Sequence, residues 1–187
     1  MIKAAIFGYG TVGSGIYEVL TRNSAVIQGK LGDRIEVKYV LDLREFPGDP
    51  VQDVLVHDVN TILDDEEVSI ICETMGGEKP AYDFTRRALE LGKSVCTSNK
   101  ELVEKHGAEL LKIAQEHHCS YLFEASVGGG IPIIRPLKSC LAANKVTSVM
   151  GIVNGTTNYM LTKMSQENMD YADVLREAQE KGYAESN

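Results

Sequence analysis

An apolar stretch that runs directly into three spaced glycines opens the chain and restricts the fold that it can adopt. Residues 1–7 read Met-Ile-Lys-Ala-Ala-Ile-Phe, and Gly8, Gly10 and Gly13 follow with the spacing G-x-G-x-x-G. An amphipathic pattern over residues 11–23 predicts a helix directly after them. In such a strand–turn–helix unit the first glycine allows a tight turn, the second lets backbone approach a pyrophosphate, and the third lets the helix lie close to the strand. The pattern predicts a dinucleotide-binding βαβ unit with the pyrophosphate at the helix N-terminus, a structural glycine turn being the alternative.

Composition and charge narrow the class of protein. Hydrophobic residues make up 43% of the chain and charged residues 25%, values typical of a soluble globular protein. The formal net charge of −8 and the absence of a basic stripe argue against a nucleic-acid surface. No apolar run approaches the ~20 residues that span a bilayer, and the N-terminus has no signal-peptide pattern. We therefore expect a cytoplasmic protein with no membrane or nucleic-acid partner.

The cysteines fit the same compartment. They are widely spaced and form no C-x-x-C pair; the four are Cys72, Cys96, Cys119 and Cys140. This spacing favours free thiols in a reducing cytosol over a metal site.

Apolar segments alternate with helical patterns along most of the chain. We expect strands at residues 1–7, 35–41, 68–73, 94–97 and 120–124, and helices at 11–23, 51–57, 81–91 and 101–117, with one further helical turn at 60–64. This alternation predicts an α/β fold, a Rossmann-type doubly wound parallel sheet with crossover helices.

The pattern changes after Glu124. Residues 127–130 read Val-Gly-Gly-Gly, and Pro132 suits the first turn of a helix that reaches about residue 142. A strand at 146–153 and a helix from 171 to 181 follow. We expect a nucleotide-binding domain over residues 1–130 and, over 131–187, the incomplete beginning of an α+β substrate and dimerisation domain. The second part is too small to bury a core alone.

Asp42 and Arg44 follow the second predicted strand, where the adenosine ribose of a dinucleotide would lie. An acid there accepts from ribose hydroxyls and favours NAD, whereas an arginine pairs with a 2′-phosphate and favours NADP. The two residues therefore favour different cofactors. For each of them, the alternative is a charged loop residue that is simply solvated.

Three further groups of residues have both a functional and a plain structural interpretation. Lys100, in Thr-Ser-Asn-Lys after the fourth strand, could hold a carboxylate or a developing alkoxide, or be a solvent-facing lysine. Glu124 and the glycine loop after it could hold a hard cation through oxygens, or simply end a strand. Residues 154–158, Asn-Gly-Thr-Thr-Asn, could bind a ligand or cap a helix.

Several longer motifs occur together in a fixed order. They are Gly8-Tyr-Gly-Thr-Val-Gly13, Thr97-Ser-Asn-Lys-Glu-Leu-Val103, Glu124-Ala-Ser-Val-Gly-Gly-Gly-Ile-Pro132, Gly151-Ile-Val-Asn-Gly-Thr-Thr-Asn-Tyr-Met-Leu161 and Ala178-Gln-Glu-Lys-Gly-Tyr-Ala-Glu185. Together they resemble homoserine dehydrogenase, and the resemblance covers essentially the whole chain. That family interconverts L-homoserine and L-aspartate 4-semialdehyde with NAD or NADP, in threonine, methionine and isoleucine biosynthesis.

The resemblance implies a role for individual residues. The implied cofactor contacts are Gly8, Tyr9, Gly10, Thr11, Val12, Gly13, Asp42, Arg44, Thr74, Ser98, Lys100 and Gly182. Lys100 matches the family's catalytic lysine beside the nicotinamide and the substrate. The implied substrate residues are Asn154, Gly155, Thr156 and Glu185, the last as the carboxylate that holds the substrate amine. Backbone oxygens of Glu124, Val127, Gly129 and Ile131 match the family's sodium site.

The family signature continues past Glu185 to a second lysine held to be the proton donor, whereas this chain has two residues after Glu185. We therefore expect the chain to be the N-terminal portion of such an enzyme, a homodimer or higher homo-oligomer when full length. Two hypotheses follow: a dehydrogenase acting on a small-molecule substrate, and an NAD(P)-binding fragment without catalysis.

Overall fold

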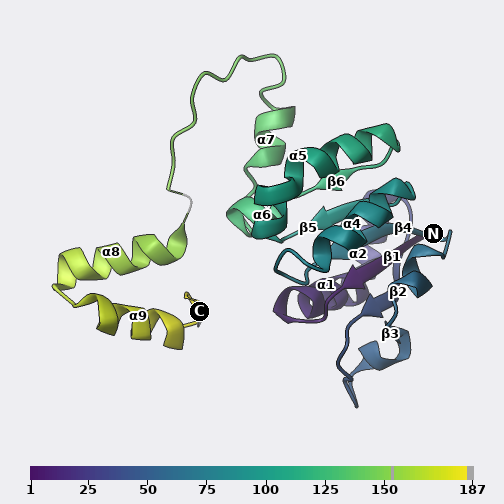
Figure 1. Cartoon of the computed structure of the whole chain (residues 1–187), viewed down its shortest axis with the longest axis horizontal. Helices are drawn as coiled ribbons and strands as arrows, with labels where there is room; N and C mark the ends of the chain where they lie inside the picture. Colours follow the sequence, from purple (N-terminus) through teal and green to yellow (C-terminus); the bar gives the residue numbers. More distant parts are fainter. Residues whose placement is uncertain (153, 185–187) are drawn as a thin grey trace. The chain divides into compact units, whose positions relative to one another are not determined.

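The structure is a computed structural model that describes residues 1–152 and 154–184. It divides into two compact units, Met1–Lys138 and Ser139–Asn187, which are described in turn. The elements are labelled in Figure 1.

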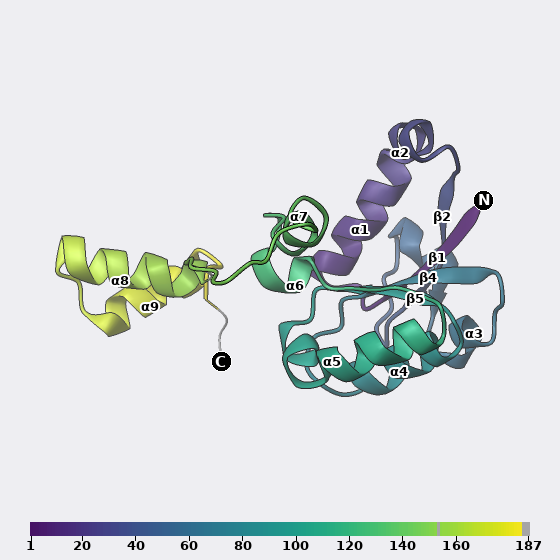
Figure 2. The ribbon, with the colours of Figure 1, turned by 90° about the horizontal axis from the view of Figure 1, so that it is seen from above.

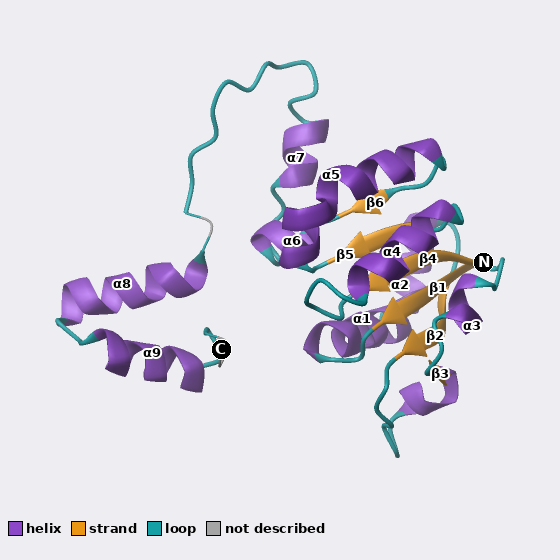
Figure 3. Ribbon diagram, viewed as in Figure 1, coloured by secondary structure: helices purple, strands orange, loops and turns teal. Residues whose placement is uncertain are grey.

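The first unit is built on a six-stranded parallel sheet of order β3-β2-β1-β4-β5-β6 (Figure 3). The strands are β1 (Ile2–Phe7), β2 (Ile35–Leu41), β3 (Leu55–Val56), β4 (Val68–Glu73), β5 (Ser94–Thr97) and β6 (Tyr121–Leu122). The order reverses at β1, which pairs with β2 on one side and with β4 on the other. This is the strand order of the Rossmann fold, whose ligands bind beyond the carboxyl ends of the strands at the reversal point. The predicted fold class is confirmed.

Helices cover both faces of the sheet, with α1 and α2 on one face and α3, α4 and α5 on the other (Figure 2). Their bounds are α1 (Thr11–Arg22), α2 (Ser24–Leu31), α3 (Asn60–Leu63), α4 (Ala81–Glu90) and α5 (Lys100–Glu116). Successive side chains of β1 point to opposite faces of the sheet, as strand geometry requires. Ile6 packs with Ile16 and Leu20 of α1, whereas Phe7 packs in the core that includes residues of α4 and α5.

Several local predictions differ from the structure. Residues 24–31 form helix α2, where the sequence pattern predicted no helix. The expected helix at 51–57 is instead a 3₁₀ turn, η1 (Pro50–Val54), followed by β3. The last strand is shorter than expected, since β6 holds only two residues. Asp49 explains η1, because its carboxylate accepts from the Val51 N–H at 2.9 Å and Pro50 occupies the first turn.

After β6 the first unit continues through two short helices, α6 (Ala125–Gly128) and α7 (Ile134–Ser139), the second of which runs across the unit boundary. In the second unit, α8 (Gly155–Glu167) and α9 (Tyr171–Glu180) form a helical hairpin (Figure 1). They share a small core of Met160, Val174 and Ala178.

The expected strand at 146–153 is wrong for residues 146–152, which form no strand; Val153 lies outside the described residues. Val149, Met150 and Ile152 are 71%, 100% and 80% exposed. A strand needs a neighbour for its backbone groups and its apolar side chains. The described part of this unit places no other strand beside this segment, so the β-type pattern has nothing to pair with.

Candidate cofactor-binding site

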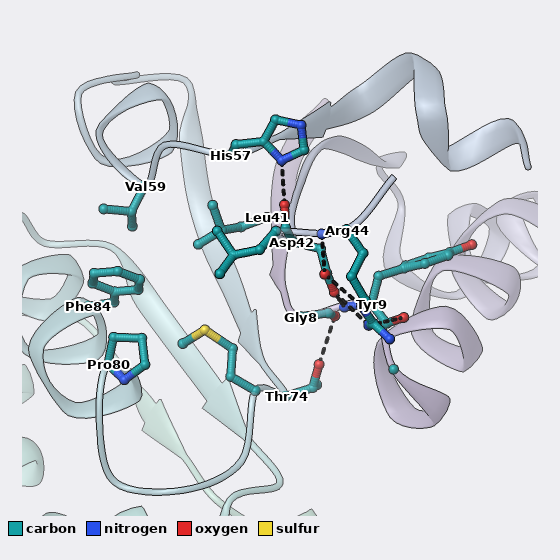
Figure 4. A pocket seen from close by; sticks show the side chains of 13 residues that line it. Gly8, Tyr9, Leu41, Asp42, Arg44, His57, Val59, Thr74, Pro80 and Phe84 are labelled. Atoms are coloured by element: carbon teal, nitrogen blue, oxygen red, sulfur yellow. Dashed lines mark hydrogen bonds and ion pairs between the residues drawn. The ribbon is translucent and has the colours of Figure 1, made fainter. Parts of the chain in front are cut away.

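A pocket of about 550 Å³ lies beyond the carboxyl ends of β1, β2 and β4 (Figure 4). Its volume is in the range of small-molecule and cofactor sites. Three chain segments line it, each directly following one of these strands, together with residues from farther along the chain; the lining residues are Gly8, Tyr9, Gly10, Leu41, Asp42, Leu43, Arg44, His57, Val59, Thr74, Met75, Pro80 and Phe84. The pocket therefore occupies the position that the strand order predicts for a ligand.

The three glycines of the turn have distinct structural reasons. Gly8 has φ +90°, a conformation that side chains other than glycine rarely adopt. A Cβ on Gly13 would lie 2.0 Å from the Gly8 carbonyl oxygen, so only glycine lets α1 approach the end of β1 this closely. A Cβ on Gly10 would meet nothing within 4 Å. Gly10 is therefore not required by the protein's own packing, and its missing side chain leaves open space beside the start of α1.

Asp42 joins the end of β2 to the glycine turn. Its carboxylate accepts from the Tyr9 backbone N–H at 2.8 Å and from Nε and Nη2 of Arg44, both at 2.9 Å. The hydrogen bonds from the Arg44 side chain are the largest cause that lowers the pKa of Asp42 well below its usual range. Arg44 also donates to the Tyr9 carbonyl oxygen at 3.2 Å, while its side chain remains 62% exposed. Asp42 thus holds an accessible guanidinium at the rim of the pocket.

His57 lies at the same rim (Figure 4). Its Nδ1 is 2.6 Å from the Asp42 carbonyl oxygen and its Nε2 is 2.8 Å from a Glu45 carboxylate oxygen. The hydrogen bond to the Asp42 carbonyl is the largest cause that raises the pKa of His57, and the bond to Glu45 is the next.

This raised pKa predicts a pH-dependent contribution to stability. Because the folded-state pKa lies above the unfolded value, protonated His57 stabilises the fold fully below about pH 6.5, and the contribution is lost as pH rises through the folded-state pKa. Urea unfolding of wild type and His57→Gln across this range should show a midpoint difference that is largest on the acid side. A difference that stays constant or grows with pH contradicts the assignment.

The remaining wall of the pocket is apolar. It consists of Leu41, Val59, Met75, Pro80 and Phe84, with Phe84 and Pro80 facing the glycine turn across the opening in Figure 4. A polar rim with a cation on one side and an apolar wall on the other suits a ligand with a charged group and a flat apolar ring.

Thr74, Ser98 and Lys100 lie at the same edge of the sheet. The single proton of the Thr74 hydroxyl lies within reach of two carbonyl oxygens, those of Phe7 at 2.9 Å and Gly8 at 3.0 Å, and so joins the ends of β1 and β4. Ser98 follows β5 and donates its N–H to the Glu73 carbonyl oxygen at 3.3 Å. Lys100 is the exposed first residue of α5. Thr74 lines the pocket, whereas Ser98 and Lys100 do not.

Glu124 caps a helix. Its carboxylate accepts the backbone N–H groups of Ile134 at 2.9 Å and Arg135 at 2.7 Å, at the start of α7. Backbone hydrogen bonds, that of Ile133 first, lower the pKa of Glu124. Within residues 1–152 and 154–184, no three His, Cys, Asp or Glu side chains gather as they would around a metal ion. A cation at this loop would therefore rely on backbone oxygens, as the sequence resemblance implies.

The predicted substrate residues begin α8 in the second unit. The Asn154 side chain accepts the Thr157 N–H at 2.9 Å, which makes it the N-cap of the helix. The Thr156 hydroxyl donates to the Tyr183 carbonyl oxygen, so the start of α8 is joined to the turn at Gly182, whose φ is +71°. Glu185 lies outside the described residues.

Comparison with known proteins decides the family. The model of the homoserine dehydrogenase NAD-binding domain matches residues 8–124, and a second homoserine dehydrogenase model matches residues 132–187. The chain belongs to the homoserine dehydrogenase family. The resemblance drawn from the sequence motifs is confirmed.

Relatives of known identity agree with the family models. Homoserine dehydrogenase from Bacillus subtilis is 40% identical over 100% of this chain, and the Lactococcus lactis enzyme is 39% identical. The crystal structure of a homoserine dehydrogenase from Thiobacillus denitrificans matches with a TM-score of 0.90 at 38% identity. A hyperthermophilic archaeal homoserine dehydrogenase mutant, solved in complex with NADPH, matches with a TM-score of 0.83 at 26% identity.

These matches cover all of this chain but less than half of the bacterial proteins. The share is 44% of the B. subtilis and T. denitrificans chains, 45% of the L. lactis enzyme and 63% of the archaeal structure. No helix within the described ranges combines the length and apolar character needed to cross a membrane.

Two buried polar residues at the carboxyl ends of the strands were not singled out from the sequence. Glu73 and Asn99 are 0% and 6% exposed and connect the loops that follow β4 and β5. The signal for Glu73 was present, since it is the only charged residue in an otherwise largely apolar strand and stands at its carboxyl end. Asn99 was visible only as part of the motif that contains Lys100.

Proposed function

We propose that the pocket at the glycine turn binds NADP or NAD, and that the chain is the cofactor-binding part of an oxidoreductase that interconverts L-homoserine and L-aspartate 4-semialdehyde. The observation that carries the proposal is the glycine turn itself, where Gly8 and Gly13 are fixed by backbone geometry and Gly10 leaves open space at the N-terminus of α1. A helix N-terminus offers free N–H groups and a favourable dipole to a pyrophosphate. That all the relatives compared are dehydrogenases favours the enzyme over the alternative of a binding fragment without catalysis.

In this proposal, different residues of the pocket bind different parts of the cofactor. The backbone of residues 8–13 binds the pyrophosphate, the apolar wall takes the adenine ring, and the ribose lies near Asp42 and Arg44. Thr74, Ser98 and Lys100 are proposed to extend the site toward the nicotinamide, and Gly182 is proposed as a further cofactor contact. The cofactor supplies the hydride chemistry when bound, and the protein's part is to bind, orient and hold a proton at the substrate oxygen.

We propose that Lys100 stabilises or relays that proton. Its ammonium would stabilise the oxygen that is an alcohol in homoserine and an aldehyde in the semialdehyde. Asn154, Gly155, Thr156 and Glu185 are proposed to hold the substrate, with Glu185 on its ammonium group.

Arg44 leads us to propose NADP over NAD. The Asp42 carboxylate already accepts from Tyr9 and Arg44, which leaves it less able to accept from a ribose hydroxyl. The Arg44 guanidinium remains exposed at the rim and matches a 2′-phosphate.

Arg44→Ala is therefore expected to weaken NADP binding about 30-fold, since a hydrogen bond to a charged group contributes ~2 kcal/mol. NAD binding should change by less than about threefold, because NAD lacks the phosphate. Calorimetric titration with each cofactor measures both, and Arg86→Ala, which removes an exposed α4 arginine paired with Glu90, is the control. An equal loss for NAD and NADP contradicts the assignment.

A sodium ion held by backbone oxygens of Glu124, Val127, Gly129 and Ile131 is part of the proposal, since a hard cation prefers oxygen ligands. So are a cytoplasmic location, a functional domain boundary at 130/131 and assembly as a homodimer or higher homo-oligomer. The matched segments 8–124 and 132–187 lie on either side of that boundary and support it. The exposed apolar residues near Met150 are the kind of surface that a partner subunit covers.

Turnover tests the proposed function. We expect the chain, joined to the remaining length of its relatives, to oxidise NADPH in the presence of aspartate 4-semialdehyde, followed by absorbance, and to reduce NADP in the presence of homoserine. Cofactor binding without turnover supports the fragment hypothesis, and no binding of either cofactor contradicts the proposal altogether.

A further inference from the structure

Glu73 is a fully buried carboxylate at the carboxyl end of β4. It is 0% exposed and lies between Phe7 of β1 and Thr97 of β5 in the sheet register. Its side chain shares the face of the sheet on which Ile71 and Val95 pack in an apolar core. A carboxylate in such a place is costly unless it is hydrogen-bonded.

Its two oxygens bind two different loops. One accepts the backbone N–H of Met75 at 2.8 Å, and the other accepts the hydroxyl of Thr97. The Thr97 oxygen in turn accepts the Asn99 N–H at 2.9 Å. Glu73 is thus bonded directly to the loop after β4 and, through Thr97, to the loop after β5.

Asn99 closes this network. Its side-chain oxygen accepts the Leu102 N–H at 3.1 Å and caps α5, and its amide nitrogen donates to the Gly77 carbonyl oxygen at 2.6 Å. The loop after β4 needs these anchors, because Gly76 and Gly77 have φ of +76° and +69° and glycine backbone has the most freedom to move.

The two loops carry different parts of the proposed site. Thr74 and Met75 line the cofactor pocket. Met75 also lies against Gly8, because a Cβ added to Gly8 would be 3.2 Å from the Met75 Cα. The other loop ends at Lys100, the residue after the α5 N-cap. Glu73 does not line the pocket itself, and it connects the loop that lines the cofactor pocket to the loop that leads to the proposed catalytic lysine.

Stability alone does not account for a carboxylate here. Replacing a buried charged group by well-packed apolar side chains is often neutral or stabilising, and Ile71 and Val95 show that this face of the sheet accepts apolar residues. A carboxylate, in contrast, accepts from an N–H and an O–H at once, which no apolar side chain can do.

We propose that Glu73 is a positioning residue that sets Lys100 relative to the bound cofactor by joining the loops after β4 and β5. The inference rests on the proposed function, because it assigns Glu73 a part in that same site. Its signature is a loss of Lys100 positioning in a chain that remains folded.

The test uses the whole chain and four variants. Glu73→Gln keeps the size of the side chain but replaces one acceptor oxygen by a donor. Thr97→Val removes the hydroxyl at constant shape, and Thr97→Ser restores it. Thr85→Val is the matched control, because the Thr85 hydroxyl is buried in the described structure without a hydrogen-bond partner and belongs to α4 rather than to either loop.

Three readouts are taken for each variant: the thermal midpoint, the NADP dissociation constant by calorimetry, and the NMR shift of ¹³C-methylated Lys100 as NADP is added, assigned with Lys100→Arg. We expect Glu73→Gln to weaken NADP binding about tenfold, as for the loss of a hydrogen bond to a charged group, and to abolish the Lys100 response. Thr97→Val should abolish the Lys100 response with NADP binding within about twofold of wild type, since only one loop is released. Thr97→Ser and Thr85→Val should resemble the wild type in both.

A folded Glu73→Gln chain with wild-type NADP binding and a wild-type Lys100 response overturns the inference alone. Should Glu73→Gln not fold, the Thr97 pair decides, and a Val variant that responds like the Ser variant overturns it. A wild-type chain that binds neither NADP nor NAD overturns the proposed function and this inference with it.

Discussion

Replacing Gly13 by alanine is expected to abolish NADP binding and to destabilise the first unit by about 3 kcal/mol, the scale of an overpacked core. The added methyl would lie 2.0 Å from the Gly8 carbonyl oxygen and 3.0 Å from the Thr74 hydroxyl oxygen. Neither atom can yield without cost, because Gly8 is fixed by a backbone hydrogen bond to Leu41 and Thr74 by bonds to the end of β1. Relief requires α1 to move away from the sheet, and the proposed pyrophosphate site moves with it.

Gly15→Ala is the matched control for this experiment. Gly15 lies in the same helix, and a Cβ there meets nothing within 4 Å. The substitution should stabilise the chain by up to about 1 kcal/mol, because alanine loses less conformational freedom in a helix than glycine. Urea unfolding and NADP titration of both variants measure the effects. Similar results for the two substitutions would mean that close helix–strand packing is not the reason for Gly13.

In a protein that joins this chain to the remaining length of its relatives, Lys100→Met is expected to lower turnover of aspartate 4-semialdehyde about 100-fold, the usual scale for removing a positioned proton-transfer group, while NADP affinity changes by less than about threefold. The asymmetry follows from the site, because Lys100 begins α5 and does not line the cofactor pocket. Steady-state rates and calorimetry give the two quantities. Methionine keeps the length of the side chain without its charge.

Lys112→Met provides the control for Lys100, since Lys112 lies on the same helix, is exposed, and is 3.7 Å from Glu116. We expect wild-type turnover from it. A Lys100→Met chain that turns over at the wild-type rate contradicts the role given to Lys100, and one that loses NADP affinity instead assigns the lysine to cofactor binding.

The parts of the fold fixed by strong periodicity and special backbone geometry could be predicted from the sequence. The limits of β2, β4 and β5 agree with the prediction to the residue, because each is a run of apolar or β-branched residues between turn signals. Gly8 and Gly13 could be assigned because only glycine satisfies their geometry. Helix α2 was missed because its apolar and polar residues do not separate onto two faces, and a window with Gly29 near its end looks like a loop.

What could not be predicted depends on contacts between segments that are distant in the sequence. From the sequence, Asp42 favours NAD and Arg44 favours NADP. In the structure the two side chains form an ion pair, and the Arg44 guanidinium stays exposed at the rim of the pocket. The role of the Glu124 carboxylate as the cap of α7 likewise depends on residues ten positions further along the chain. The role of Glu73 could not be predicted, because it depends on hydrogen bonds to Met75 and to Thr97 of another strand. The strand expected at 146–153 failed for the opposite reason, since the described residues supply no neighbour for it.

The most direct test of the account is an NMR titration of the ¹⁵N-labelled chain with NADP. We expect saturable shifts of the backbone amides of residues 8–13 and 42–44. We expect no change at a separate surface hollow that is lined in part by Ala108, Leu111 and Leu122. Gly13→Ala should remove the response. Amides of residues 8–13 that remain unchanged at millimolar NADP and NAD, or shifts confined to another part of the chain, would contradict the claim that the glycine turn of this homoserine dehydrogenase family member binds the cofactor.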